Sequence, residues 1–163
     1  MFVTTSRKGN LLEKRFSKYL TKYLPGIVYL PRGKTPLLKI FKKATYLGHK
    51  YFLKVSSINE NILFSIYVSK ENSFFLEREY LLEVLDLRHL KPFSYVSSIN
   101  QSFQDVKDVF YFISKKNKSL KSTYGVFLTS QEDVFDFLED GEYLGFRFKI
   151  LNVKTIDWKS LIH

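Results

Sequence analysis

The first 47 residues repeat one order of elements twice: a short β-prone run, a basic turn and an amphipathic helix. Residues 2–5 predict a strand, followed by a Ser-Arg-Lys-Gly turn and a helix over residues 10–24. Residues 27–30 predict a second strand, and a Pro-Arg-Gly-Lys turn leads into a second helix over residues 35–47. Parallel strands end at the same edge of a sheet, so both basic turns are expected at one edge of an α/β fold.

Local signals indicate where the two helices begin and end. Asn10 is the expected N-cap of the first helix, and Glu13 stands three residues later in the capping-box position. In the second helix Thr35 is the expected N-cap, Pro36 takes the first helical position and Gly48 follows the last turn.

The rest of the chain is richer in predicted strands. Residues 51–57 and 62–69 alternate apolar and polar side chains about a polar turn, which predicts a β-hairpin. Residues 79–90 fit either a helix or a strand, and we favour the strand. Beyond them we expect a loop over 92–102, a helix over 103–114, a basic loop to 121, a strand over 124–128, a helix capped by Thr129 or Ser130, and closing strands over 144–153.

The positive charge of the chain is concentrated in its first third. Residues 1–59 hold 13 Lys and Arg against one acid, Glu13, a net charge of +12, whereas the remaining residues carry −2. Such an asymmetry is typical of a surface that binds a polyanion. The alternative is a solvated lysine-rich face of the kind found in hyperthermophile proteins, but such faces pair Lys with Glu, and residues 14–59 contain no acid. Nucleic-acid binding is therefore favoured over solubility alone.

Composition excludes several other classes of protein. The 163 residues are 45% hydrophobic and 17% aromatic, which is ample for a packed core. The absence of Cys excludes disulfides, and three scattered His offer no zinc-ligand spacing. The sequence has no nucleotide-binding or zinc-peptidase motif. Charged residues soon follow Met1, with no apolar stretch of signal-peptide length and none long enough to span a bilayer. We expect a soluble cytoplasmic protein with no cofactor, metal or membrane partner.

One class of enzyme has to be weighed against a purely binding protein. The segment RKGNLLEKRF is similar to the opening of archaeal Holliday-junction resolvases, where a basic turn precedes a metal-binding Glu. Such a nuclease also needs an Asp and a Glu-x-Lys on the following hairpin to hold its divalent ion. This chain has neither, so Glu13 is interpreted as a helix cap and the protein as non-catalytic. A DNA-binding or junction-resolving protein remains the alternative.

The same opening, VTTSRKGN followed by EKRFSKYL and YLPRGKTPLLKIF, resembles the Brix domain in its short, single-domain archaeal form. The shared marks are the Thr-Thr-Ser-Arg-Lys strand and turn, a first helix bearing Arg15, Ser17 and Lys18, and the Arg-Gly-Lys turn at 32–34. The likeness continues more weakly through STYGVFLTSQEDVFDFLEDGEYLGFRFKILNV. One difference is Gly9-Asn10, where the family commonly has Pro-Ser.

This resemblance implies two small pseudo-symmetric α/β halves with mixed sheets and flanking helices, similar to anticodon-binding domains. In this chain the halves would cover about residues 1–75 and 76–163 of a single domain over 1–163. The resemblance also implies a non-catalytic factor in ribosome biogenesis, active in rRNA processing and assembly as an RNA chaperone. Its partner would be ribosomal RNA or pre-rRNA, joined by ribosomal or assembly proteins, and we expect the protein to be a monomer.

The predicted RNA-binding residues come from both turns and from the first helix. Arg7 and Lys8 are expected to bind phosphates, together with the backbone N–H groups that open the helix. The whole set is Ser6, Arg7, Lys8, Lys14, Arg15, Lys18, Lys22, Arg32 and Lys34. Duplex DNA or an acidic ribosomal protein would also suit a basic surface, and both stay open as partners.

Overall fold

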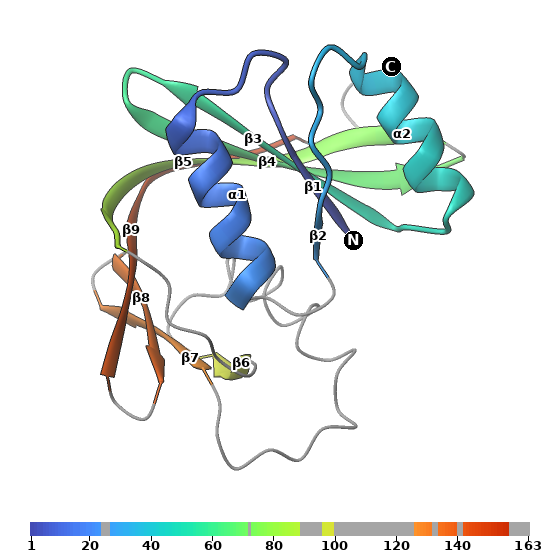
Figure 1. The fold of residues 1–163 in the computed structure, drawn as a ribbon. Coiled ribbons are helices and arrows are strands. Elements are labelled where there is room, and N and C mark those ends of the chain that lie inside the picture. The colour runs from blue at the N-terminus through green and yellow to red at the C-terminus, as the bar shows by residue number, and fades with distance from the viewer. Residues whose placement is uncertain are drawn as a thin grey trace.

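The computed structural model describes residues 1–23, 27–71, 73–88, 96–99, 126–131, 134–139 and 142–156. In these residues two helices accompany one mixed sheet of nine strands, in the order β2-β1-β3-β4-β5-β9-β8-β7-β6 (Figure 1). The elements are β1 (Phe2–Thr5), α1 (Leu11–Tyr23), β2 (Val28–Tyr29), α2 (Leu37–Tyr46), β3 (Tyr51–Ile58), β4 (Asn61–Lys70), β5 (Ser73–Leu87), β6 (Val96–Ile99), β7 (Val126–Gln131), β8 (Val134–Glu139) and β9 (Glu142–Thr155). The predicted α/β class with a mixed sheet and flanking helices is confirmed.

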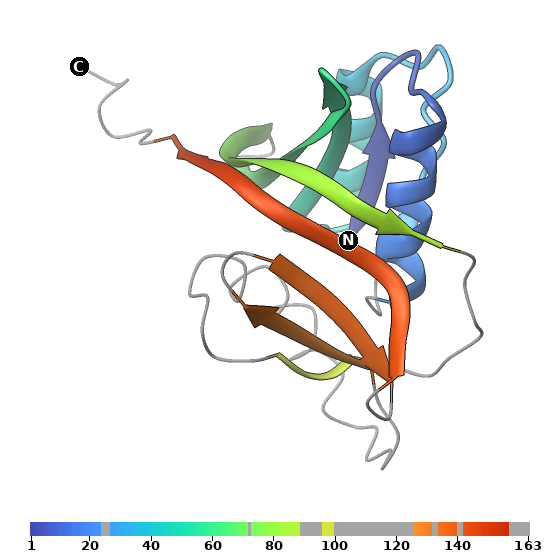
Figure 2. The same cartoon turned by 90° about the vertical axis from the view of Figure 1, so that its left-hand side faces the viewer.

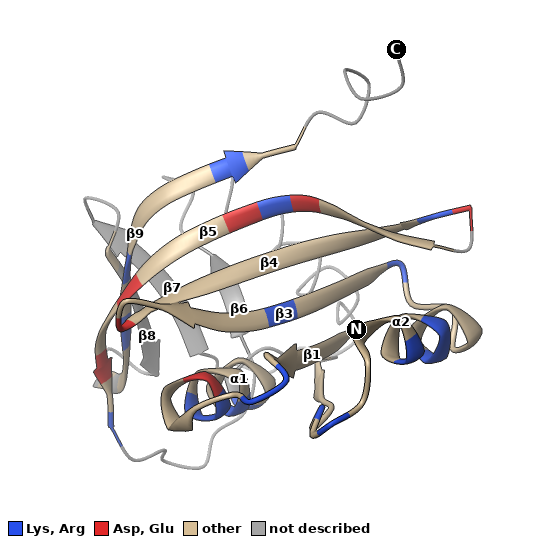
Figure 3. Cartoon of the chain, turned by 90° about the horizontal axis from the view of Figure 1, so that it is seen from above, with Lys and Arg blue, Asp and Glu red and all other residues tan. Residues whose placement is uncertain are grey.

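Strand β1 lies between two parallel neighbours, β2 and β3, and all four of its residues are buried. Successive side chains of a strand point to opposite faces of the sheet. Val3 packs in one cluster with Phe16 of α1, while Phe2 packs in a second cluster with Ile40 of α2. The two helices therefore cover opposite faces of the sheet, and Figure 3 shows them on either side of β1.

The larger cluster packs α1 against the middle strands of the sheet. Phe16 is 1% exposed and meets three rings edge-on, with centroid distances of 6.4 Å to Phe64, 5.4 Å to Phe146 and 6.0 Å to Phe148. Phe64 belongs to β4, whereas Phe146 and Phe148 belong to β9. Burying aromatic rings of this size dominates core energetics, so α1 is fixed against β4 and β9, the two neighbours of β5 in the sheet.

The sheet contains the same pairing pattern twice. β1 is parallel to β3, which is followed by antiparallel β4 and β5; β6 is parallel to β7, which is followed by antiparallel β8 and β9. The last strands of the two groups, β5 and β9, pair antiparallel and join them (Figure 2). This arrangement fits the expected pseudo-symmetric halves, while a division near residue 75 stays a prediction.

Two local predictions in the middle of the chain are confirmed. β3 and β4 form the expected hairpin, and its two turn residues, Asn59 and Glu60, have φ values of 48° and 68°. Two successive residues with positive φ are typical of the type I′ turn, whose twist matches that of the flanking strands. The ambiguous segment 79–90 is a strand as far as Leu87, as part of β5.

The second half corrects two other predictions. The helix expected after Thr129 or Ser130 is wrong, because 126–131 and 134–139 form the antiparallel strands β7 and β8. The loop expected over 92–102 is wrong at Val96–Ile99, which form β6. The predicted helix over 103–114 and the basic loop that follows lie outside the described residues.

Helix α2 begins one residue later than predicted. Pro36 occupies the N-cap position with ψ of 142°, an extended conformation, and no side chain caps the helix there. The predicted Thr35 cap is therefore wrong. The C-terminal end is confirmed, because the Gly48 N–H donates to the Thr45 carbonyl at 2.8 Å and the His49 N–H donates to the Ala44 carbonyl at 3.0 Å, a Schellman pattern.

Candidate nucleic-acid interface

The two basic turns leave the sheet at the same edge. β1 and β2 are parallel neighbours, and the Thr4 hydroxyl donates to the Leu30 carbonyl at 2.7 Å just where the strands end. After β1 the chain crosses to the α1 face, and after β2 it crosses to the α2 face. In open α/β sheets ligands bind outside the carboxyl ends of neighbouring strands whose connections leave to opposite faces. The segments Ser6–Gly9 and Pro31–Lys34 therefore form the candidate site.

The first turn is built around a buried carboxylate. Glu13 is 3% exposed, and its Oε2 accepts hydrogen bonds from the Ser6 N–H at 3.1 Å and the Ser6 hydroxyl at 2.7 Å. Its Oε1 accepts from the Ser57 hydroxyl of β3 at 2.9 Å. The Glu13 N–H donates to Asn10 Oδ1 at 2.9 Å, which confirms Asn10 as the N-cap. The interpretation of Glu13 as a helix cap is wrong for its carboxylate, which fixes the preceding turn to β3.

Gly9 completes this network because no side chain fits at its position. A Cβ atom there would lie 2.7 Å from Thr5 Oγ1 and 2.9 Å from Glu13 Oε2. The Gly9 N–H donates to the Ser6 carbonyl at 3.2 Å and closes the turn. The Asn10 side-chain amide donates to the Ser57 hydroxyl at 3.0 Å, so the same serine ties both ends of the turn to β3.

The basic side chains of the first turn take no part in the network that holds it. Arg7 and Lys8 are exposed, and within the described ranges neither makes a hydrogen bond or an ion pair. Ser6 donates both its N–H and its hydroxyl to Glu13, so it positions the turn from inside. The turn thus presents two cations on a backbone that is fixed by neutral donors and one buried carboxylate.

The second turn is closed by one of its own basic residues. Arg32 Nε donates to the Thr35 carbonyl at 3.1 Å, and the Thr35 N–H donates to the Arg32 carbonyl at 2.9 Å. Gly33 has φ of +52°, the left-handed region that favours glycine. Lys34 is exposed and makes no bond in the described part of the chain, whereas Arg32 is half-buried.

The charge of Arg32 also acts on Tyr67 of β4. Burial and the charge of Glu79 raise the pKa of Tyr67, and the charge of Arg32 opposes that rise.

Helix α1 extends the basic surface away from the first turn. Lys14, Arg15 and Lys18 are exposed, and Lys22 is half-buried, so burial lowers the pKa of Lys22. Figure 3 shows basic segments on α1 and in both turns. Arg15 donates a hydrogen bond to the Leu87 carbonyl at the end of β5. All nine predicted residues thus lie in the two turns or on α1, and Arg15 contacts the carboxyl end of β5.

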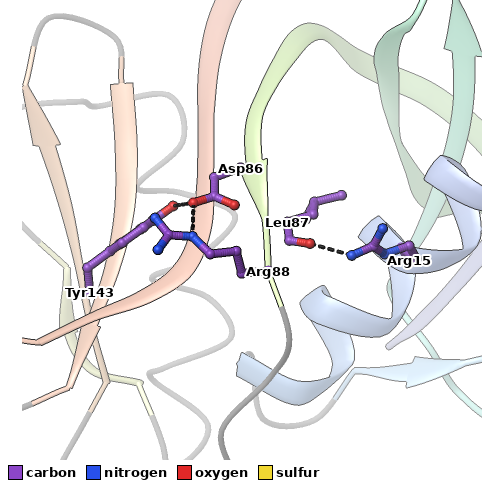
Figure 4. A network of polar contacts seen from close by, with 5 residues as sticks. All are labelled: Arg15, Asp86, Leu87, Arg88 and Tyr143. Carbon is purple, nitrogen blue, oxygen red and sulfur yellow. Dashed lines mark hydrogen bonds and ion pairs between the residues drawn. The ribbon is translucent and has the colours of Figure 1, made fainter.

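Sequence reasoning missed a polar cluster at the end of β5. Asp86 Oδ2 accepts a hydrogen bond from Arg88 Nε at 2.6 Å and another from the Tyr143 hydroxyl at 3.0 Å (Figure 4). The guanidinium carbons of Arg88 and Arg147 lie 5.1 Å and 4.7 Å from the centre of the Tyr143 ring. Asp86 and Tyr143 are 57 residues apart, so no local pattern could have predicted the cluster.

Opposing effects set the pKa values in this cluster. Burial by itself raises the pKa of Asp86, but hydrogen bonds from Arg88 and Tyr143 and the charges of Arg88 and Arg147 outweigh it and leave the pKa below its ordinary value. The Asp86 hydrogen bond and charge raise the pKa of Arg88. Both groups therefore stay ionised throughout the neutral range.

Comparison with known proteins supports the resemblance drawn from the opening segment. A scan against models of protein families gives no match. Over 99 residues the chain is 34% identical to a probable Brix domain-containing ribosomal biogenesis protein of Saccharolobus solfataricus. The predicted resemblance to the Brix domain family is confirmed. This match covers 61% of the chain and spans 55%, about half, of the length of the Brix relative.

The fold has a close parallel among solved structures. The crystal structure of a probable ribosomal biogenesis protein from Aeropyrum pernix K1 superposes with a TM-score of 0.62 at 17% identity, covering 96% of this chain and 98% of that one. This likeness shows the fold. In the part of the chain that the structure describes, no three His, Cys, Asp or Glu side chains are grouped to hold a metal ion. Neither α1 nor α2 is long and apolar enough to cross a membrane.

Proposed function

We propose that this chain acts in ribosome biogenesis by binding ribosomal RNA, or its precursor, through the two basic turns and the exposed face of α1. The observation that carries the proposal is the pair of basic turns at one sheet edge, where Arg7, Lys8 and Lys34 are exposed and unpaired among the described residues. Cations that no carboxylate neutralises favour an anionic ligand. Similarity to proteins named for ribosomal biogenesis supports ribosomal RNA as that ligand.

The proposed mechanism is binding without catalysis. Arg7 and Lys8 contact phosphates, and Arg32 and Lys34 add a second contact across the same sheet edge. The exposed basic residues of α1 contact further phosphates along the same RNA strand. Arginines in such turns also stack on unpaired bases, which is a common way of recognising structured RNA. Ser6 acts indirectly, because its two donors hold the turn on Glu13.

A salt-resolved titration tests this function. The full chain is titrated with a structured fragment of ribosomal RNA, a duplex DNA of equal charge and an unstructured RNA of equal charge. We expect the structured ribosomal RNA to bind more tightly than both controls at every salt concentration. Equal binding to all three, with the same steep salt dependence, would leave only a non-specific basic surface and overturn the ribosomal assignment.

A double substitution tests the first turn itself. Arg7→Ala with Lys8→Ala should weaken binding and lower the slope of log K against log salt by about one unit or less per lost phosphate contact. The matched control is Lys50→Ala with Lys70→Ala, which removes two exposed charges from the opposite edge of β3 and β4. An unchanged slope in the turn variant, or an equal drop in the control, would remove the turn from the site.

Docking of an acidic ribosomal or assembly protein is a second candidate function, favoured by the outer side of α2. Leu38, Tyr46 and Leu47 are 65%, 90% and 50% exposed there. Exposed lysines lie among them at positions 39, 42 and 43. We expect Leu38→Ser with Tyr46→Ser to weaken binding to purified ribosomal particles while leaving binding to naked ribosomal RNA unchanged. Loss of both would place α2 in the RNA-binding surface instead.

A further inference from the structure

The cluster at the end of β5 holds Arg88 more firmly than an ordinary surface arginine. Its backbone N–H donates to the Gly145 carbonyl of β9 at 2.8 Å, and its Nε donates to Asp86 Oδ2 at 2.6 Å. The guanidinium also lies against the Tyr143 ring, whose hydroxyl binds the same Asp86 oxygen. Arg88 is thus anchored through its backbone and its Nε, beside the Tyr143 ring. Figure 4 shows its bond to Asp86 and the position of Tyr143.

The anchored side chain remains accessible to a ligand. The Arg88 side chain is 69% exposed despite these contacts. Only Nε is engaged with the Asp86 carboxylate, and the two terminal nitrogens carry four of the five N–H donors of a guanidinium. A planar pair of donors of this kind matches two oxygens of a phosphate. Since the side chain is already ordered, less rotamer entropy is lost when it binds.

The charge around Arg88 is positive on balance. Two further arginines, Arg15 and Arg147, belong to the same cluster. The carboxylate that the Arg88 side chain contacts is that of Asp86. Arg147 is opposite Asp86 of β5 in the strand register, and its charge helps to lower the pKa of Asp86. Arg15 is exposed and donates to a neutral carbonyl, that of Leu87, so it keeps its full charge at the surface.

Arg15 also connects this cluster to the basic face of α1. Leu87, whose carbonyl it binds, is the residue next to Arg88 in the chain. We propose that Arg88, supported by Asp86 and Tyr143 and continued by Arg15, is a preformed phosphate-binding site for an RNA strand that runs on from α1. This inference rests on the RNA-binding function proposed above and extends it to the junction of β5 and β9.

Two substitutions of Arg88 separate its geometry from its charge. The probe is the structured ribosomal RNA fragment, titrated over a range of salt concentrations. Arg88→Ala should lower affinity by about tenfold and reduce the salt slope by about 0.7–0.9. Arg88→Lys keeps the charge but loses the planar donor pair, so we expect an affinity loss of about threefold or more at an unchanged slope. The control Lys154→Ala removes one exposed charge elsewhere on β9.

Asp86→Asn tests the supporting carboxylate through the sign of its effect. Electrostatics alone predicts tighter RNA binding, because one negative charge is removed beside the arginines. A carboxylate that positions Arg88 predicts weaker binding instead, since a neutral amide holds Nε less firmly. Tighter binding by Asp86→Asn would overturn the positioning role.

The outcomes distinguish failure of this site from failure of the proposed function. If the wild type prefers ribosomal RNA and both Arg88 variants bind it with wild-type affinity and slope, the site is overturned while the function stands. The same is concluded if Arg88→Ala only lowers the melting temperature, because a purely structural tie between β5 and β9 would do that. If the wild type shows no preference among the three nucleic acids, the proposed function fails first, and the site fails with it.

Discussion

Two carboxylates organise basic surfaces in this protein, and they do so in opposite ways. Glu13 is buried, and its partners are the neutral donors of Ser6 and Ser57. The side chain of Asp86 is 20% exposed, and its partners are the guanidinium of Arg88 and the hydroxyl of Tyr143. Glu13 therefore fixes a backbone and leaves the neighbouring cations free, whereas Asp86 fixes a cation directly.

This difference matters for how each surface can bind an anion. A cation paired with a carboxylate gives up part of its field but gains a defined geometry. Unpaired cations such as Arg7 and Lys8 keep their whole field but pay the rotamer entropy when a ligand binds. The first turn is thus suited to attract a polyanion, and the β5 end is suited to orient one.

Removing the buried carboxylate should have the largest effect on stability. Glu13→Ala leaves the N–H and hydroxyl of Ser6 and the hydroxyl of Ser57 without their acceptor, so we expect a loss of about 3 kcal/mol in the free energy of unfolding. In a chain of this size that corresponds to about 6–12 °C in Tm. Urea denaturation measures the loss in free energy of unfolding, and thermal denaturation measures the fall in Tm.

The milder Glu13→Gln keeps one acceptor oxygen and removes the charge. On electrostatics alone it should tighten RNA binding, but a role in holding the first turn predicts weaker binding. Tighter RNA binding by Glu13→Gln, with little change in Tm, would show that the turn does not depend on this carboxylate. The contrast drawn between Glu13 and Asp86 would then break down.

The two glycines of the basic turns should differ in what they tolerate. Gly9→Ala places a Cβ against Thr5 and Glu13, so we expect overpacking to cost about 2 kcal/mol. At Gly33 a Cβ would have no heavy atom within 4 Å, and the cost should be the left-handed strain of about 1 kcal/mol. Urea denaturation of both variants measures which substitution lowers the free energy of unfolding more. A larger loss for Gly33→Ala would contradict the tighter packing assigned to the first turn.

The smallest expected effect is a pH dependence at Asp86. Its folded-state pKa is below the ordinary value of 3.8, so its stabilising contribution is present above that value and is lost as the pH falls through the lower folded-state pKa. The wild type should therefore be slightly more stable than Asp86→Asn above about pH 5, and the difference should vanish in acid. Melting temperatures between pH 2 and 7 test this, and a gap that is the same at both ends would contradict the ion pair.

Local sequence signals predicted the first third of the chain well. The strand at 2–5, the Asn10 cap, both basic turns and the hairpin at residues 58–61 all depend on residues within a few positions of one another. The same reasoning failed at 129–139, where hydroxyl and acidic residues imitate a helix start. There the long-range pairing of strands decides the structure, since in the antiparallel register Val134 is paired with Lys149 and Phe135 with Phe148 of β9.

By itself, the sequence determined the α/β class, the concentration of positive charge in residues 1–59 and the two turns that carry the predicted site. Tertiary structure decided which polar groups hold the first of those turns and the end of β5. Glu13 finds Ser57 across 44 positions, and Asp86 finds Tyr143 across 57. Propensity and capping act over a single turn of the chain, whereas these bonds depend on strand register, which only the assembled sheet fixes.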